Sequence, residues 1–272
     1  MSNKLKVSCI QMDMDFGSSS ENFVKAEKLI RQAATGSPDV IVLPEMWNTG
    51  FFPEESVRDY FDKEGKNTKR LMGALAKELK INIVAGSVAS IKGNESYNSS
   101  YIFDRQGNCI AEYDKTHLFS PMKEDKHFSK GNGVCKFELD NKSCGIIICY
   151  DIRFPELVRT MSVTGLDCLF VVAQWPKVRT KHLTALATAR AIENQMFVCC
   201  CNSCGKAGKN VYAGHSLMID PWGEVLAEAD GTETVITAEL DFGVIENIRN
   251  SINVFKDRRP ELYGVCEKSK EV

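Results

Sequence analysis

The sequence lacks long apolar runs and a strong net charge. No stretch of the 272 residues approaches the roughly 18 apolar residues of a membrane span, and the first residues have no apolar core of a secretory signal. The net charge is −2, so neither nucleic acid nor an anionic membrane surface is an expected partner. We therefore expect a soluble, cytoplasmic protein.

Signs of division along the chain are also absent. There is no Pro/Gly/Ser-rich linker, abrupt change of composition, usable repeat or low-complexity segment. A chain of this length can bury a substantial core. We predict a single domain over residues 1–272. Residues 241–272 are charged and weakly patterned, so we predict a C-terminal extension that packs at a subunit interface, with a frayed tip at residues 267–272.

Metal-ligand spacing is missing as well. The segment from Cys199 to Cys204 holds one CxxC spacing, but no second CxxC or paired histidine follows it. The four histidines are dispersed, although His117 and His182 are candidates to line a pocket. The cysteines number eleven, which favours free thiols in a reducing compartment. We predict no metal site.

The apolar periodicity predicts alternating strands and helices. Strands are expected over residues 5–12, 40–43, 81–87, 145–149 and 168–172. Helices are expected over 20–34, 68–79, 155–163 and 181–195, the first with a serine N-cap candidate before Phe23. Hairpins are expected over 97–113 and 214–228, around turns at 105–108 and 220–223. This alternation predicts a layered α/β fold.

Cys149 follows the apolar run 145–148, which is typical of a buried parallel strand. Ligands of α/β sheets gather where such strands end, and Arg153 follows four residues later, where a cation would favour the nucleophilic thiolate. The alternative is a small buried apolar residue, as most cysteines are.

Two further polar residues end strand-like runs in the same way. Glu45 follows Ile-Val-Leu-Pro, and Lys115 follows Glu-Tyr-Asp. Taken singly, the first is usually a turn and the second a solvated charge. Together with Cys149 they are far more specific, and on these residues the chain resembles the nitrilase, or carbon–nitrogen hydrolase, superfamily, whose Glu-Lys-Cys triad occurs in this order. The resemblance extends from Gln11 through the Trp222-Gly223 hairpin.

The resemblance implies an αββα sandwich that pairs into an αββα–αββα homodimer or a higher homo-oligomer. It also implies amide hydrolysis without a metal or organic cofactor. Cys149 would be the nucleophile and Glu45 the base that activates it. Lys115 would stabilise the oxyanion together with the backbone N–H of Tyr150.

A second glutamate is implied in the loop that precedes a Gly-Asp or Gly-Asn pair. Counting back from Gly131-Asn132 selects Glu124, with the adjacent Asp125 as the alternative. In the family this carboxylate holds the lysine and positions the substrate amide.

Substrate choice is predicted from the residues around Cys149. In the branch that cleaves ω-amides of dicarboxylic acids, the arginine at the position of Arg153 grips the free carboxylate, for which a guanidinium fork is suited. The alternative is an ion pair with Glu156 or Asp151. Trp175 would cap the apolar part of the substrate, and Arg179 is a candidate second carboxylate ligand.

The segments Cys-Tyr-Asp-Ile-Arg-Phe-Pro, Gln-Trp-Pro and Arg-Ala-Ile-Glu-Asn-Gln resemble the ω-amidases most. In the last of these, Arg190, Glu193 and Asn194 are expected to anchor a helix. The implied substrates are 2-oxoglutaramate, 2-oxosuccinamate and succinamate, small carboxylate-bearing amides. Alternatives are N-carbamoyl compounds, other aliphatic amides and nitriles, or a non-catalytic binding protein of this fold.

Overall fold

The computed structural model describes residues 3–50 and 60–264. In these residues the main strands form two sheets. The eight-stranded sheet has the order β16-β1-β2-β4-β6-β5-β3, with β7 paired to β6. Its strands are β1 (Lys4–Gln11), β2 (Val40–Val42), β3 (Asp62–Lys63), β4 (Asn82–Val84), β5 (Val88–Lys92), β6 (Glu95–Phe103), β7 (Cys109–Asp114) and β16 (Thr234–Asp241).

The six-stranded sheet has the order β15-β14-β11-β10-β9-β8. Its strands are β8 (Cys135–Leu139), β9 (Lys142–Ile148), β10 (Cys168–Ala173), β11 (Phe197–Asn202), β14 (Leu217–Ile219) and β15 (Val225–Glu228). The strands β9, β10 and β11 run parallel and are buried along most of their length. A small ribbon of β12 (Lys206–Ala207) and β13 (Asn210–Val211) lies apart from both sheets.

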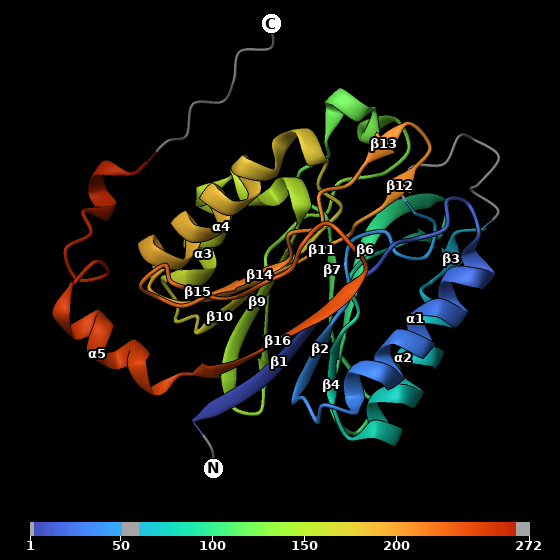
Figure 1. Cartoon of the computed structure of the whole chain (residues 1–272). Coiled ribbons are helices and arrows are strands. Elements are labelled where there is room, and N and C mark those ends of the chain that lie inside the picture. Colours follow the sequence, from blue (N-terminus) through green and yellow to red (C-terminus); the bar gives the residue numbers. More distant parts are fainter. Residues whose placement is uncertain (1–2, 51–59, 265–272) are drawn as a thin grey trace, which may run out of the picture.

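Helices cover the outer faces of the two sheets (Figure 1). The helices α1 (Ser19–Ala34) and α2 (Lys66–Leu79) lie on the outside of the eight-stranded sheet, and α3 (Pro155–Ser162) and α4 (Thr180–Asn194) on the outside of the other. No helix in the described part of the chain is both long and apolar enough to cross a membrane. Two sheets with helices on their outer faces follow the predicted αββα order. Pairing of two such chains stays a prediction.

The alternation of apolar side chains along the strands builds these layers. In β2, Val40 and Val42 belong to the core between the sheets, whereas Ile41 packs in the core under α1 and α2. All three are fully buried. Burying a side chain of this size stabilises the fold by about 1.5–3 kcal/mol. The sandwich thus depends on short strands that are apolar on both faces.

Most predicted elements are confirmed, with ends shifted by a few residues. The helix α1 begins at Ser19, and its N-cap is a serine before Phe23, as predicted, but this Ser18 makes no side-chain capping bond. The start of this helix is fixed instead by Asn22, whose side chain accepts from the Asp15 N–H and donates to the Asp15 carbonyl. The strands β5, β8 and β16 were not expected from the pattern.

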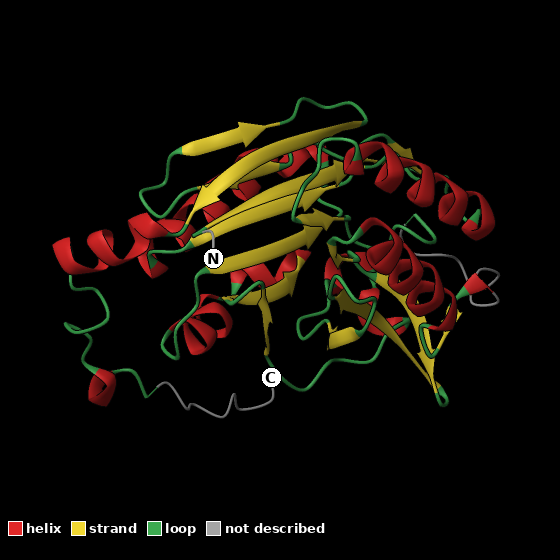
Figure 2. Ribbon diagram, turned by 90° about the horizontal axis from the view of Figure 1, so that it is seen from below, coloured by secondary structure: helices red, strands yellow, loops and turns green. Residues whose placement is uncertain are grey.

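The C-terminal segment contains a helix that its weak pattern did not predict, α5 (Gly243–Ser251). Figures 1 and 2 show α5 and the chain after it on the side that carries α3 and α4. There the guanidinium groups of Arg159 and Arg249 each lie 5.5 Å from the centroid of the Phe255 ring. This part of the segment packs on its own chain. The subunit-interface role stays a prediction, and residues 267–272 lie outside the described residues.

Gly86 allows the chain to pass closely behind Glu45. Its φ is +61°, and a Cβ built there would lie 2.0 Å from the Pro44 carbonyl oxygen. The neighbouring Ser87 N–H donates to that same oxygen at 3.1 Å. Because only glycine fits this approach, Gly86 helps to hold Glu45 at the end of β2.

We expect Gly86→Ala to lower the free energy of unfolding by about 1–3 kcal/mol more than Gly93→Ala. Gly93 has a similar φ of +59°, but a Cβ there meets no atom within 4 Å, so the pair separates the clash from the backbone strain. Chemical unfolding of both variants measures the difference. Equal losses of stability would show that the contact with Pro44 is not limiting.

Candidate active site

Cys149 lies on a strained turn where β9 meets a 3-10 helix, η4 (Cys149–Arg153). Its φ is +48°, which a residue with a side chain seldom adopts. Asp151 holds the turn by accepting the Ile148 N–H at 3.0 Å. Arg190 of α4 donates to the Ile152 carbonyl at 2.8 Å, which confirms its expected anchoring role. The strain at Cys149 is thus supported from both sides.

Asp151 also ties this turn to the loop after β7. It is fully buried and accepts the Tyr113 hydroxyl at 2.7 Å and the His117 backbone N–H at 2.9 Å. The His117 ring lies 2.9 Å from the same carboxylate and stacks on Phe154. The segment that carries Lys115 is therefore fixed relative to Cys149. His117 serves this connection rather than the pocket wall.

Glu45, Lys115 and Glu124 form a buried ionic cluster. Lys115 follows β7, and its Nζ lies 2.8 Å from Glu45 Oε1 and 2.9 Å from Glu124 Oε2. Glu124 is in the short 3-10 helix η3 (Glu124–Lys126), and its Oε2 accepts the Phe119 N–H at 2.6 Å. Of the two predicted carboxylates Glu124 is the one in the cluster, since Asp125 is exposed and lies 3.9 Å from Lys126.

Glu45 joins the two sheets. It follows β2 of the eight-stranded sheet, and its N–H donates to the Ala173 carbonyl at the end of β10 at 3.3 Å. In return the Gln174 N–H donates to Glu45 Oε2 at 2.9 Å. The site therefore lies where strand ends of both sheets meet.

Burial and charge shift the pKa values of the cluster. Burial and the charge of Glu45 raise the pKa of the Cys149 thiol well above its ordinary value, against the opposing effect of Lys115. Burial lowers the pKa of Lys115, but Glu124, Glu45 and Cys149 outweigh it, and the net pKa is raised. Burial likewise raises the pKa of Glu124. The cation acting on the thiol is thus Lys115, where the local sequence pattern suggested Arg153.

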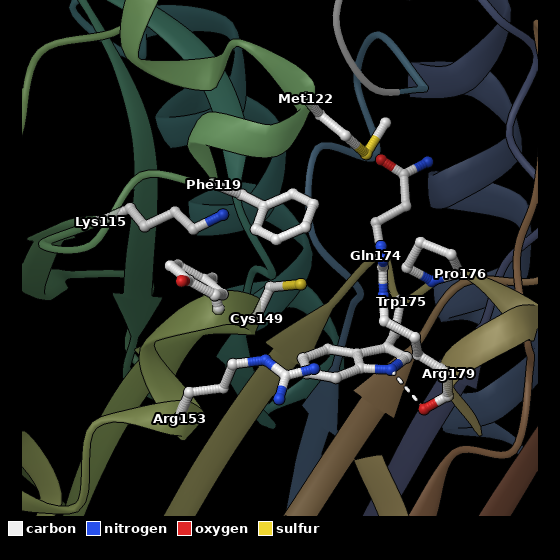
Figure 3. A pocket seen from close by; sticks show the side chains of 10 residues that line it. Lys115, Phe119, Met122, Cys149, Arg153, Gln174, Trp175, Pro176 and Arg179 are labelled. Atoms are coloured by element: carbon white, nitrogen blue, oxygen red, sulfur yellow. Dashed lines mark hydrogen bonds between the residues drawn. The ribbon is translucent and has the colours of Figure 1, made fainter. Parts of the chain in front are cut away.

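A pocket opens over the Cys149 sulfur (Figure 3). The Lys115 ammonium points into it from one side. The predicted residues Lys115, Cys149, Tyr150, Arg153, Trp175 and Arg179 all line it, together with Phe119, Met122, Gln174 and Pro176. The wall is largely aromatic or apolar, so charges at its rim act in a poorly solvated space.

Two guanidinium groups at this pocket each pack against an aromatic ring. Arg153 lies 4.8 Å from the Trp175 ring centroid, and its Nη2 is 3.2 Å from the His182 ring. Arg179 lies 5.1 Å from the Phe119 ring centroid. The Trp175 indole N–H donates to the Arg179 carbonyl at 2.8 Å. Within the described residues, Arg153 forms neither of the alternative ion pairs, with Glu156 or with Asp151. Asp151 instead accepts the hydrogen bonds that hold the Cys149 turn.

The structure thus brings together all eight residues predicted for the site, six of them on the pocket wall and Glu45 and Glu124 behind it. Sequence reasoning missed Asn98, whose side chain donates to both Glu45 and Glu124. It weighed Asp151 only as a partner of Arg153. Asn98 lies in the middle of β6, where no local signal marks it.

The comparisons with known proteins agree with this geometry. The carbon–nitrogen hydrolase family model matches residues 6–250. The chain belongs to this family. A 2-oxoglutaramate amidase of Bacillus subtilis is 44% identical over 96% of this chain and 100% of its own length.

More distant relatives of this carbon–nitrogen hydrolase point the same way. The ω-amidase NIT2 of Xenopus tropicalis is 34% identical over 92% of this chain and 93% of its own. The crystal structure of Saccharomyces cerevisiae Nit3, a nitrilase-superfamily member, superposes with a TM-score of 0.87 at 29% identity, covering 94% of this chain and 97% of that one. The predicted superfamily and fold are therefore confirmed.

The part of the chain that the structure describes contains no set of side chains suited to bind a metal ion. Among those residues, no group of three or more His, Cys, Asp or Glu side chains is arranged to hold an ion. In the cysteine-rich strand β11, the Cys199 sulfur lies 3.9 Å from that of Cys168, and the Cys201 thiol donates to the Ile10 carbonyl. These thiols are core side chains.

We expect Glu45→Gln to lower the pH at which the Cys149 thiol ionises. The charge of Glu45 and its hydrogen bond both raise this pKa, so removing them leaves the opposing effect of Lys115. The rate of alkylation of Cys149 by iodoacetamide, followed by peptide mass spectrometry across pH, measures the change. Glu138→Gln, on the exposed part of β8, is the control. An alkylation midpoint that stays or rises would contradict this electrostatic description.

Proposed function

We propose that this carbon–nitrogen hydrolase is an ω-amidase, which cleaves the terminal amide of a small dicarboxylate monoamide to the dicarboxylate and ammonia. The observation that carries the proposal is the pocket itself, which sets a thiol and a buried Glu-Lys-Glu cluster against two guanidinium groups. The first set suits amide hydrolysis, and the second suits a substrate with a free carboxylate. The amidase names of the relatives support the same substrate class.

Acylation begins when Glu45 accepts the thiol proton of Cys149 as the sulfur attacks the amide carbon. The carbonyl oxygen becomes an oxyanion, which the Lys115 ammonium and the Tyr150 backbone N–H stabilise. The tetrahedral intermediate then collapses, the C–N bond breaks, and Glu45 returns the proton to the departing nitrogen. Ammonia leaves, and the acyl group remains on Cys149 as a thioester.

Deacylation repeats the same steps with water. Glu45 accepts a proton from a water molecule whose oxygen attacks the thioester carbon, and the same donors stabilise the second oxyanion. The C–S bond then breaks, Glu45 passes its proton to the departing sulfur and the thiol is regenerated. The product leaves as a carboxylic acid, which ionises in water to the carboxylate. Glu124 does not touch the reacting atoms in this scheme; it holds Lys115 in place and neutralises part of its charge.

Specificity comes from the other end of the pocket. Arg153 and Arg179 bind the free carboxylate, and Trp175 packs against the short carbon chain between the two ends. Because each guanidinium rests on an aromatic ring, it is oriented before the substrate arrives. The substrates that fit are 2-oxoglutaramate, 2-oxosuccinamate and succinamate.

A substrate panel tests the proposal through ammonia release. The purified protein should hydrolyse 2-oxoglutaramate or succinamate faster than an N-carbamoyl amino acid, a neutral aliphatic amide or a nitrile. Cys149→Ala should remove this activity while leaving the thermal unfolding temperature close to that of the parent. Absence of turnover with every ω-amide would refute the substrate class, and activity in Cys149→Ala would refute the mechanism.

Arg153→Ala should lower kcat/KM for an ω-amide by about tenfold to a hundredfold, since a charge-assisted contact with the carboxylate is lost. The neutral aliphatic amide is the internal control, because it has no carboxylate to bind. Its kcat/KM should change much less. Equal losses for the charged and the neutral substrate would assign Arg153 a structural role instead.

A further inference from the structure

Asn98 contacts both carboxylates of the buried cluster. It lies in β6, is 1% exposed, and its Nδ2 lies 2.9 Å from Glu45 Oε1 and 3.2 Å from Glu124 Oε1. Its backbone carbonyl accepts the Lys115 N–H at 2.9 Å. The Asn98 side chain thus touches both carboxylates, and the backbone carbonyl of the same residue holds the backbone of Lys115.

The orientation of this amide follows from its partners. Ionised carboxylates only accept hydrogen bonds, so the NH2 group of Asn98 faces them. One N–H bond of this group is directed at Glu45 and the other at Glu124. The Asn98 Oδ1 then turns away, buried and without a hydrogen-bond partner among the residues that the structure describes. Leaving a polar atom unpaired is costly, which indicates that the contacts of the NH2 group outweigh it.

Asn98 duplicates the bridge that Lys115 makes. The Lys115 Nζ donates to the same two oxygens, at 2.8 Å from Glu45 Oε1 and 3.0 Å from Glu124 Oε1. Each of these oxygens therefore accepts from both the ammonium and the amide. If the ammonium moves toward an oxyanion, the amide still bridges the two acids.

We infer that Asn98 is a positioning residue that keeps Glu45 and Glu124 together in their charged forms while Lys115 turns to the substrate. This inference rests on the proposed amidase mechanism for its consequence, and on the hydrogen bonds alone for its geometry. Two carboxylates and one ammonium leave an excess of negative charge, and the amide N–H groups offset it without adding a titrating group. Asn98 acts through Glu45 and does not touch the substrate.

The groups that face the two carboxylates come from several elements. Lys115 follows β7, Cys149 begins η4, and Tyr212 follows β13. Burial, Glu45 and Cys149 raise the pKa of the Tyr212 phenol above its ordinary value. Lys115 and Asn98 both donate hydrogen bonds to the two carboxylates. Loss of Asn98 should make both carboxylates easier to protonate.

The kinetic test compares pH profiles of kcat/KM for the amide that the parent enzyme hydrolyses best. Asn98→Ala should lower kcat/KM at neutral pH by about tenfold to a hundredfold and move the acid limb of the profile to higher pH. Asn98→Asp, which adds a third carboxylate, should move it further. Asn98→Ser keeps one donor and should lie between Asn98→Ala and the parent.

Ser100→Ala is the matched control. Ser100 lies two residues along β6, is also fully buried, and its hydroxyl makes no hydrogen bond within the described part of the chain. Its variant should keep the parental pH profile. A uniform loss of activity in Asn98→Ala and Asn98→Ser with the acid limb unmoved, or no loss at all, would overturn the inference.

A second measurement does not depend on turnover. In protein labelled with ¹³C at the glutamate carboxyl carbons, the signals of Glu45 and Glu124 are assigned from Glu45→Gln and Glu124→Gln. Their joint titration should move to higher pH in Asn98→Ala and Asn98→Ser and stay unchanged in Ser100→Ala. An unmoved titration would overturn the role of Asn98, whereas a moved titration in an enzyme that cleaves no ω-amide would refute only the proposed substrate.

Discussion

The site depends on burying two carboxylates beside one ammonium. Removing such charges from water is costly, and a buried ion pair seldom repays the full penalty. Here Glu45, Lys115 and Glu124 have almost no exposed side-chain surface. Backbone N–H groups of Phe119 and Gln174 and the amide of Asn98 supply the remaining donors. An arrangement of this cost is better explained by chemistry than by stability.

The same constraint explains why the site is at the meeting point of the sheets. Glu45 follows a strand of the eight-stranded sheet, and Cys149 follows a strand of the six-stranded one. The groups that donate hydrogen bonds to Glu45 come from both sides, Asn98 from β6 and Gln174 from the end of β10. The exchange of hydrogen bonds between Glu45 and the Ala173–Gln174 segment fixes the distance between the two. Asp151 makes a second connection, from the Cys149 turn to Tyr113 and His117. The strands thus hold the charged and polar groups of the site close together, although in solution these groups would repel one another or move apart.

Local patterns were sufficient to find the residues that end strands. Glu45, Lys115 and Cys149 each follow an apolar or strand-like run, and their order resembles one superfamily. Asn98 could not be found in this way, because it sits inside a strand and its partners are distant in sequence. The pairing of Asp151 with Tyr113 and His117 was hidden for the same reason. The start of α1 depends on the Asn22 side chain, which binds the Asp15 backbone, rather than on a serine side-chain cap, and the local pattern did not show this.

The helix α5 could not be predicted because its own sequence pattern is weak. Its segment is charged and has few apolar residues, yet Ile245 and Ile248 are buried against the sandwich. Two buried side chains on nine residues are too weak a pattern to predict a helix, but they suffice once a packed surface is present.

Recognition and chemistry occupy different depths of one pocket. The thiol and its carboxylates are buried, where weak solvation strengthens each charge, while Arg153 and Arg179 are half-buried at the pocket wall. The two parts are linked through Trp175, which supports Arg153 with its ring and holds the Arg179 carbonyl with its indole N–H. In the proposed mechanism, a substrate anchored by its carboxylate would thereby be held at a fixed distance from Cys149. The length of the chain between carboxylate and amide then decides which molecules place a carbonyl carbon over the sulfur.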